Sequence, residues 1–333
     1  MRLQSRARQD KGSPSSILST LIHLFVLFFL IVPLLAEAQV KITTKADRIS
    51  VEIDGKPFTS LYKGEEAHKP FFYPLLTASG KPVTRAFPME KVEGDPTDHP
   101  HQRSLWIGAE NVSGMDFWEI ETSYNRPHKG SIVFRRVLET KNGRKTGGLR
   151  VLADWVSPEG ETVISETLAV KFYAKPSESR IFDIDLRLQA VKTVKFDDDH
   201  DAILGLRLAP AFDEHTGGKV VDAEGITGVD TIRGKRTAWV DWQTDLQGEK
   251  VGVAVMDSPR NFRHPTPWHL RPEGIFFASP FAFRTYSKSA EDGSLTLQAG
   301  KELHLRYRIF IHPAAAAVAP KFQEFSKQEL SKQ

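Results

Sequence analysis

The 333-residue chain contains no cysteine. Disulfide bonds, a thiol nucleophile and cysteine-ligated metal sites are therefore excluded, and any catalytic or metal-binding group has to come from histidines, carboxylates and other polar side chains. A chain of about 300 residues can bury a core large enough to fold without covalent cross-links.

A strong excess of charge of one sign is also missing. Lys and Arg number 45 against 42 Asp and Glu, which gives a formal net charge of +3. Nucleic acid is not an expected partner, because nucleic-acid-binding domains concentrate basic residues in blocks or patches. Internal repeats, low-complexity segments and Pro/Gly/Ser-rich linkers are absent as well, which favours a single domain.

Only one long apolar run is present, at residues 21–35. Four basic residues precede it and a small-residue pattern ends at Ala38, as in a secretory signal peptide. We therefore expect residues 1–38 to be a signal peptide cleaved near Ala38, with export to the periplasm or extracellular space and no stable membrane insertion afterwards. An uncleaved anchor is the alternative, although a run of about 15 residues is short for the roughly 20 that a spanning helix needs.

Helical periodicity is almost absent from the remaining chain, and segments of alternating polar and apolar residues replace it. Many such segments predict the all-β class and a large antiparallel β-sandwich, with a barrel as the alternative. We expect one β-sandwich domain over 39–320 and a short C-terminal tail at 321–333, which could form a helix. The predicted strands are 40–44, 48–53, 57–62, 131–139, 149–156, 161–173, 180–191, 202–208, 239–242, 250–256 and 302–312.

The segment from about 63 to 130 alternates weakly and is rich in Pro, His and aromatic residues, which is typical of long functional loops. It contains His99, His101 and Arg103. If this stretch is extended, the three side chains share one face. Two imidazoles and a guanidinium are costly to bury without polar partners, so we expect them to bind a ligand.

Two more histidines, His264 and His269, belong to a second cluster downstream, and we predict that the two clusters meet in one cleft. Three interpretations remain open. His99 or His101 could transfer protons, because imidazole titrates near neutral pH. Both could bind a divalent metal with His264 or His269 as a third ligand. Finally, they could cap loops by hydrogen bonding to backbone carbonyls.

Asp116 is a further candidate catalytic group, since two aromatic neighbours would raise the pKa of its carboxyl by desolvation. Trp106, Trp118 and Trp268 flank the polar motifs. As a group they are candidates for stacking on the apolar faces of a sugar. Core packing is the alternative interpretation, and it is favoured for any single ring.

Three arginines are candidates for substrate binding: Arg85, Arg103 and Arg207. A guanidinium presents a planar fork of donors that suits anionic and carbonyl groups. Arg207 interrupts an apolar strand, and its structural alternative is an ion pair with Asp183 or Asp185.

The acidic run at 197–201 contains one histidine, His200. It lacks the glycine and glutamate spacing of a calcium-binding loop. We therefore favour a solvated turn over a cation site at this run.

Several motifs together resemble the bacterial family known as methane oxygenase PmoA-like, over essentially the whole mature chain. The motifs are Lys69–Pro74, Pro82–Arg85, His99–Trp106, Met115–Trp118, Met256–Pro259, Arg263–His269 and Gly274–Phe281. That family is similar in turn to the galactose mutarotase-like group, so the resemblance implies a β-supersandwich that binds carbohydrate in an open cleft. Aldose epimerases of that group use a histidine acid and a glutamate base, and no residue here matches their glutamate motif. We expect neither methane oxidation nor copper, because no set of membrane spans follows the signal segment.

The leading hypothesis is an exported protein that binds a sugar or glycoside and acts on it by acid–base chemistry of the lyase, epimerase or hydrolase type. A non-catalytic carbohydrate-binding module is one alternative. A metal-dependent enzyme with histidine ligands is the other. The sequence assigns no cofactor with certainty, although a divalent metal fits the histidines, and it does not predict the oligomeric state.

Overall fold

The computed structural model describes Met1 and residues 39–64, 66–288 and 290–330. Apart from Met1, the predicted signal peptide lies outside the described residues, as does the end of the C-terminal tail. Among the described residues, we find no helix that is both long and apolar enough to cross a bilayer.

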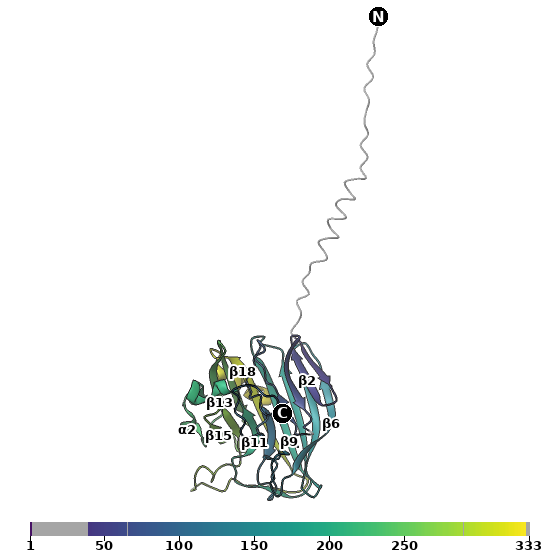
Figure 1. Cartoon of the computed structure of the whole chain (residues 1–333), viewed down its shortest axis with the longest axis vertical. Helices are drawn as coiled ribbons and strands as arrows, with labels where there is room; N and C mark the ends of the chain where they lie inside the picture. Colours follow the sequence, from purple (N-terminus) through teal and green to yellow (C-terminus); the bar gives the residue numbers. More distant parts are fainter. Residues whose placement is uncertain (2–38, 65, 289, 331–333) are drawn as a thin grey trace. The chain divides into compact units, whose positions relative to one another are not determined.

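The first of two eight-stranded sheets contains the N-terminal strands (Figure 1). Every strand pair in it is antiparallel. Its strands, in spatial order, are β1 (Val40–Thr44), β2 (Arg48–Ile53), β3 (Lys56–Tyr62), β4 (Phe71–Tyr73), β5 (Leu105–Ala109), β11 (Ala202–Arg207), β16 (Ile275–Ala278) and β15 (Trp268–Arg271).

The second sheet is also antiparallel throughout and contains the longest strands. In spatial order it comprises β12 (Lys219–Asp222), β13 (Trp239–Leu246), β14 (Glu249–Asp257), β18 (Glu302–Pro313), β9 (Arg180–Ala190), β8 (Thr162–Tyr173), β7 (Thr146–Val156) and β6 (Ser131–Lys141). The smaller elements are the pair β10 (Val194–Phe196) and β17 (Leu295–Leu297), the 3-10 turns η1 (Pro210–Phe212) and η2 (Glu214–Thr216), and the helices α2 (Val229–Ile232) and α3 (Val318–Leu330).

The two sheets pack face to face through alternating apolar side chains. Phe58 on β3 makes edge contacts with Phe172 on β8 and Phe182 on β9, with ring centroids 6.1 and 5.7 Å apart. Phe72 on β4 approaches the same Phe182 ring at 6.5 Å. These contacts confirm the predicted all-β class and the large antiparallel sandwich.

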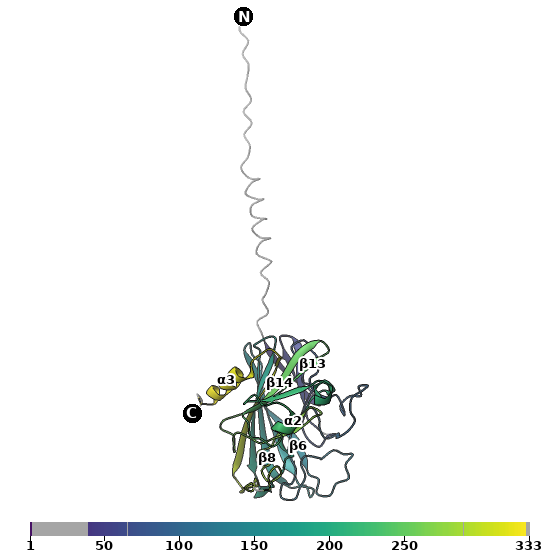
Figure 2. The ribbon, with the colours of Figure 1, turned by 90° about the vertical axis from the view of Figure 1, so that its left-hand side faces the viewer.

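Helix α3 covers part of the outer face of the second sheet (Figure 2). Its Val318 and Phe325 pack with Met256 of β14 and Phe310 of β18. The helix begins at Val318, three residues before the predicted tail, because Pro320 is tolerated in a first helical turn. Residues 321–330 of the predicted tail belong to this helix.

One carboxyl group, that of Glu166 on β8, is buried between the sheets. Its Oε2 accepts a hydrogen bond of 2.8 Å from the indole N–H of Trp155, and burial raises the pKa of this carboxyl to about 7. A carboxyl with a raised pKa in the folded state is stabilised by protonation, so it contributes most to stability below its unfolded pKa of 4.5.

Replacing Glu166 by Gln is therefore expected to raise the free energy of unfolding at pH 8 by up to about 3 kcal/mol. The wild-type protein loses this stability as the pH rises from 4.5 to about 7, whereas the amide does not titrate. Denaturant unfolding at pH 4.5 and pH 8 measures the effect, with Glu302→Gln on the exposed surface as the control. A stabilisation that is equal at both pH values would contradict this account.

Candidate functional site

The outer face of the first sheet, which points away from the second sheet, has an aromatic floor. One buried cluster contains Trp106 on β5, Phe277 on β16 and Trp118 from the loop after β5. The ring centroids of these residues lie 4.9 to 5.7 Å apart. Two glycines in the strands permit this packing. A Cβ atom at Gly205 would lie 2.4 Å from the Trp106 ring, and one at Gly108 would lie 2.6 Å from a backbone oxygen.

Two carboxyl groups meet at one end of this floor. Glu110 follows β5 and Asp201 precedes β11, and the Glu110 N–H donates to the Asp201 carbonyl at 2.8 Å. Burial, together with the negative charge of Asp199, raises the pKa of both carboxyls to about 7. The pair therefore gains and loses protons near neutral pH. Because the two carboxyls interact, the two protonation steps belong to the pair and not to either residue alone.

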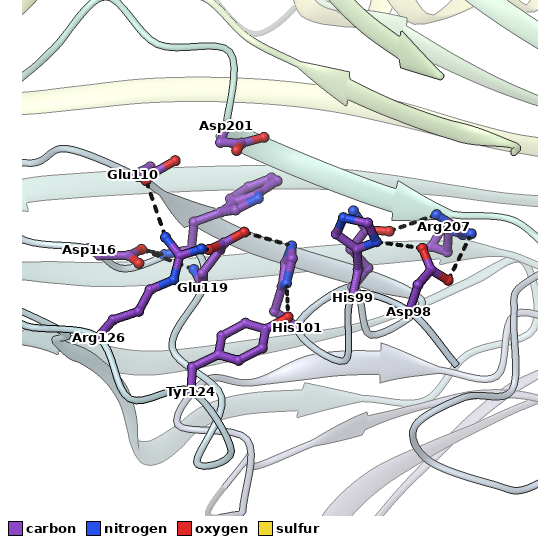
Figure 3. Close-up of polar contacts among 12 residues, drawn as sticks. Asp98, His99, His101, Glu110, Asp116, Glu119, Tyr124, Arg126, Asp201 and Arg207 are labelled. Carbon is purple, nitrogen blue, oxygen red and sulfur yellow. Dashed lines mark hydrogen bonds and ion pairs between the residues drawn. The ribbon is translucent and has the colours of Figure 1, made fainter. Parts of the chain in front are cut away.

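A single arginine, Arg126, lies between this pair and a third carboxylate (Figure 3). Its Nη1 is 3.8 Å from Glu110 Oε1, and its Nη2 forms an ion pair with Glu119. Asp116 accepts hydrogen bonds from the N–H groups of Trp118 and Glu119 through Oδ1, while its buried Oδ2 has no hydrogen-bond partner. Burial raises the pKa of the Asp116 carboxyl, in the direction expected from its aromatic neighbours.

The two histidines of the first cluster lie beside these carboxylates in Figure 3, with ring centroids 5.6 Å apart. His101 is buried; its Nδ1 is 2.9 Å from the Tyr124 hydroxyl and its Nε2 is 3.9 Å from Glu119 Oε1. Burial and the nearby Lys69 charge hold the pKa of His101 well below its usual range, so the ring is neutral. His99 is partly exposed and contacts the Asp98 carboxylate.

The expected extended geometry of this stretch is wrong. His99 has a φ of 45°, and the Arg103 N–H closes a tight turn onto the His101 carbonyl at 3.0 Å. Arg103 therefore does not share a face with the histidines. Its guanidinium makes a bidentate ion pair with Glu121, at 2.6 and 2.7 Å.

Arg85 and Arg207 are both buried and hold the histidine loop in place. Arg85 donates to the Asp98 carboxylate at 2.7 Å and to the His99 carbonyl at 2.9 Å. Arg207 Nη1 donates to Gln102 Oε1 at 2.9 Å, and its Nη2 is 3.5 Å from Asp98. The structure thus gives both arginines protein partners on the outer face.

Arg207 does form a structural ion pair with a nearby acid, but the acid is Asp98 and not Asp183 or Asp185. Both carboxylates lie on β9 of the second sheet, where their partners come from β18. Arg308 pairs with Asp183 at 2.6 Å and Arg306 pairs with Asp185 at 2.7 Å.

The two histidines of the second cluster, His264 and His269, lie in different parts of the structure. The prediction that all four histidines share one cleft is therefore wrong. His264 Nδ1 is 2.7 Å from Asp257 at the end of β14, and its ring stacks on Phe322 of α3. His269 instead points from β15 to the outer face of the first sheet, where its ring lies 4.3 Å from that of His200. Trp268, the neighbour of His269, points the opposite way into the core between the sheets.

The aromatic residues do not offer the exposed faces that sugar stacking needs. Trp106 and Trp118 are 1% and 0% exposed, and Trp268 is 0% exposed. Core packing, the alternative interpretation, therefore describes all three rings in this structure. Trp106 and Trp118 form the floor under the polar groups, while Trp268 is part of the main core.

One cation could be held at the acidic run. Ligand atoms of Asp199, His200 and Asp201 lie within 4.8 Å of one another, and carboxylate and imidazole groups are suitable ligands for several divalent metals. The solvated turn expected here is wrong, because Asp198 accepts backbone N–H bonds from Arg284 at 2.9 Å and Gly293 at 2.7 Å. The run therefore anchors a neighbouring loop.

Lys69, which the sequence did not single out as a site residue, is buried under the same face. Its ammonium donates to the Trp118 carbonyl at 2.7 Å and lies 5.5 Å from the Trp106 ring centroid. Burial lowers the pKa of this amine to about 7. Lys69 thus joins the loop before β4 to the loop after β5 and places a second near-neutral titrating group close to the carboxyls.

The fold and this face define the class: an antiparallel β-sandwich with a cluster of carboxyl, imidazole and amine groups on the outer face of one sheet. Residues 48–321 match the model of a family of unknown function, DUF6807, and the chain belongs to that family. No curated protein sequence matches the chain.

Several solved structures of carbohydrate-active proteins are weakly similar. Heparan sulfate lyase HepC from Pedobacter heparinus has 11% identity and a TM-score of 0.38, over 85% of this chain and 36% of the lyase. A glycoside hydrolase family 97 enzyme from Pseudoalteromonas sp. strain K8 has 10% identity and a TM-score of 0.31, over 82% and 34%. This chain spans about a third of the length of each.

A protein from Klebsiella pneumoniae subsp. pneumoniae assigned as an aldose 1-epimerase has a more similar length. It shows 10% identity and a TM-score of 0.37, with 87% of each chain covered. TM-scores below 0.5 do not carry a functional argument, so the function proposed below rests on the side chains of this chain.

Proposed function

We propose that the outer face of the first sheet binds a sugar or glycoside and transfers protons on it. The carboxyl pair Glu110 and Asp201 carries this proposal. Because both pKa values are raised to about 7, one member can donate a proton while the other accepts one at neutral pH. Lyase, epimerase and hydrolase reactions all need such a donor and acceptor.

Each neighbouring group has a role in this proposal. Arg126 lies between Glu110 and Glu119 and limits the negative charge that would otherwise accumulate. His99 is the exposed imidazole and can contact a ligand from the solvent side. His101, neutral and held by Tyr124, can hydrogen-bond a ligand hydroxyl without adding charge.

A hydroxyl-rich ligand suits this surface better than an apolar one. The face presents hydrogen-bond donors and acceptors side by side, and the hydroxyls of a sugar can pair with both kinds of group. The motif resemblance to PmoA-like proteins supports the same ligand class and brings no oxidation chemistry into the proposal. Export remains a prediction from the signal segment.

The test is to incubate protein starting at residue 39 with a panel of glycosides and oxidised (keto) glycosides and to follow products by mass spectrometry. We expect turnover of at least one member. Calorimetric binding without turnover across the panel would make the protein a carbohydrate-binding module instead. Absence of both binding and turnover would overturn the proposal.

The two histidine positions should respond differently to substitution. His99→Ala is expected to lower turnover about 10-fold to 100-fold, because it removes the exposed imidazole beside the carboxyls. His264→Ala should leave turnover within about twofold, because His264 contacts Asp257 and α3. Initial rates measured with thermal melting of each variant test this, and equal losses would contradict the separation of the two clusters.

A further inference from the structure

A cavity of about 220 Å³ opens next to the polar site, on the same side of the first sheet. Its walls include two aromatic rings, Tyr62 and Phe71, which stack with centroids 5.2 Å apart and an interplanar angle of 3°. Asp47, Lys63 and Arg103 supply polar atoms around them. The cavity thus combines a flat aromatic wall with charged groups.

The cavity adjoins the aromatic floor of the polar site through residues of two elements. Phe71 on β4 pairs in register with Trp106 on β5, the residue that forms the aromatic floor. Arg103, which follows His101 by two residues, places its guanidinium 5.2 Å from the Phe71 ring centroid. The same arginine is fixed by its bidentate pair with Glu121. Arg103 therefore lies at the cavity wall, two residues along the chain from His101.

The polar site and the cavity together are larger than a single sugar ring. Neighbouring strands lie about 4.8 Å apart, so β3 at the cavity is roughly 10 Å from β5 under the site. Along β11, the six steps from Asp201 to Arg207 cover roughly 20 Å at about 3.3 Å per residue. Polar side chains extend over this whole length in Figure 3. An extended ligand uses more of this surface than a monosaccharide does.

The charges favour a neutral ligand. The polar site holds four acidic side chains, those of Glu110, Asp116, Glu119 and Asp201, against two basic ones, those of Arg126 and Lys69. Anionic sugars would be repelled there. In the cavity, the ammonium of Lys63 is already occupied by the carbonyls of residues 45 and 46, which leaves it few donors for an anion.

We propose that this cavity binds a second sugar unit of a neutral oligosaccharide whose first unit occupies the carboxyl–imidazole site. The inference rests on the proposed function and extends it to a substrate class. The Tyr62 ring already stacks on Phe71 and has the Arg48 guanidinium 5.4 Å from its centroid, so it contacts the second unit through its ring edge. The carboxylate of Glu66 at the cavity rim accepts hydrogen bonds from the hydroxyls of that unit.

The experiment compares tetrasaccharides with monosaccharides by calorimetry. The probes are cello-, xylo-, malto- and chito-tetraose, their monosaccharides, and a uronate-containing tetrasaccharide. The wild-type protein should bind one neutral tetrasaccharide at least about 10-fold more tightly than its monosaccharide. Tyr62→Ala should remove this advantage and leave monosaccharide binding within about twofold. Tyr62→Phe, which keeps the ring, should retain it.

A surface variant tests the inference independently if Tyr62→Ala fails to fold. Glu66→Gln is exposed and should weaken tetrasaccharide binding about threefold, while the exposed Glu52→Gln on β2 should have no effect. The inference is overturned if Tyr62→Ala weakens both ligands equally, if it weakens neither, or if the uronate probe binds most tightly. Turnover of a small glycoside with no preference for longer chains would overturn the inference alone. Failure of every sugar to bind would overturn the proposed function as well.

Discussion

Glu110→Gln is expected to lower turnover of a glycoside substrate by about 100-fold to 10,000-fold, the usual contribution of a positioned acid or base. The amide keeps the size of the side chain but cannot exchange a proton. Asp201→Asn should cause a loss of similar size. Because the two carboxyls act as a unit, the double variant should be little worse than either single variant.

The pH dependence identifies the pair more sharply than the rate alone. With both pKa values raised to about 7, wild-type activity requires one protonated and one ionised carboxyl and should peak near neutral pH. Either substitution should remove one limb of that profile from the residual activity. Glu139→Gln, on the exposed strand β6, is the control and should change neither rate nor profile. A Glu110→Gln protein that keeps more than a third of the activity would refute the assignment.

The sequence pattern predicted the strands with one buried face but missed several short strands with two. On β9 and β18 apolar residues alternate with polar ones, so their positions were predictable. Strands β5 and β16 are buried on both faces and read as short continuous apolar runs, which do not distinguish strand from helix. Both of these strands lie directly under the candidate site.

The acid pair could not be predicted for a related reason. Glu110 and Asp201 each adjoin a strand, but only the pairing of β5 with β11 brings them together. Their separation of 91 positions leaves no local spacing to detect. Period-2 alternation also separates Trp268 from His269, because adjacent residues of β15 point to opposite faces. A cluster read along the sequence therefore need not be a cluster in space.

The second large effect is expected at Arg85, whose substitution by Met should lower the free energy of unfolding by about 3 kcal/mol. Its side chain is fully buried and donates to the Asp98 carboxylate, the Asp98 carbonyl and the His99 carbonyl. Methionine fills the space but leaves these acceptors without a donor. Arg85→Lys should recover only part of the loss, because one ammonium cannot reproduce a planar fork of donors. Denaturant unfolding measures the loss, with exposed Arg150→Met as the control.

This substitution should also impair function, because Arg85 anchors the loop that carries His99 and His101. The expected signature is a larger fall in kcat/KM than the unfolded fraction explains, with the pH profile of the carboxyl pair unchanged. A double-mutant cycle with Asp98→Asn separates the ion pair from the carbonyl contacts. If the carboxylate carries most of the stabilisation, the double variant should lose less stability than the sum of the two single variants. Strict additivity would mean that the carbonyl contacts hold the loop, and the positioning of His99 would then be independent of the charge on Asp98.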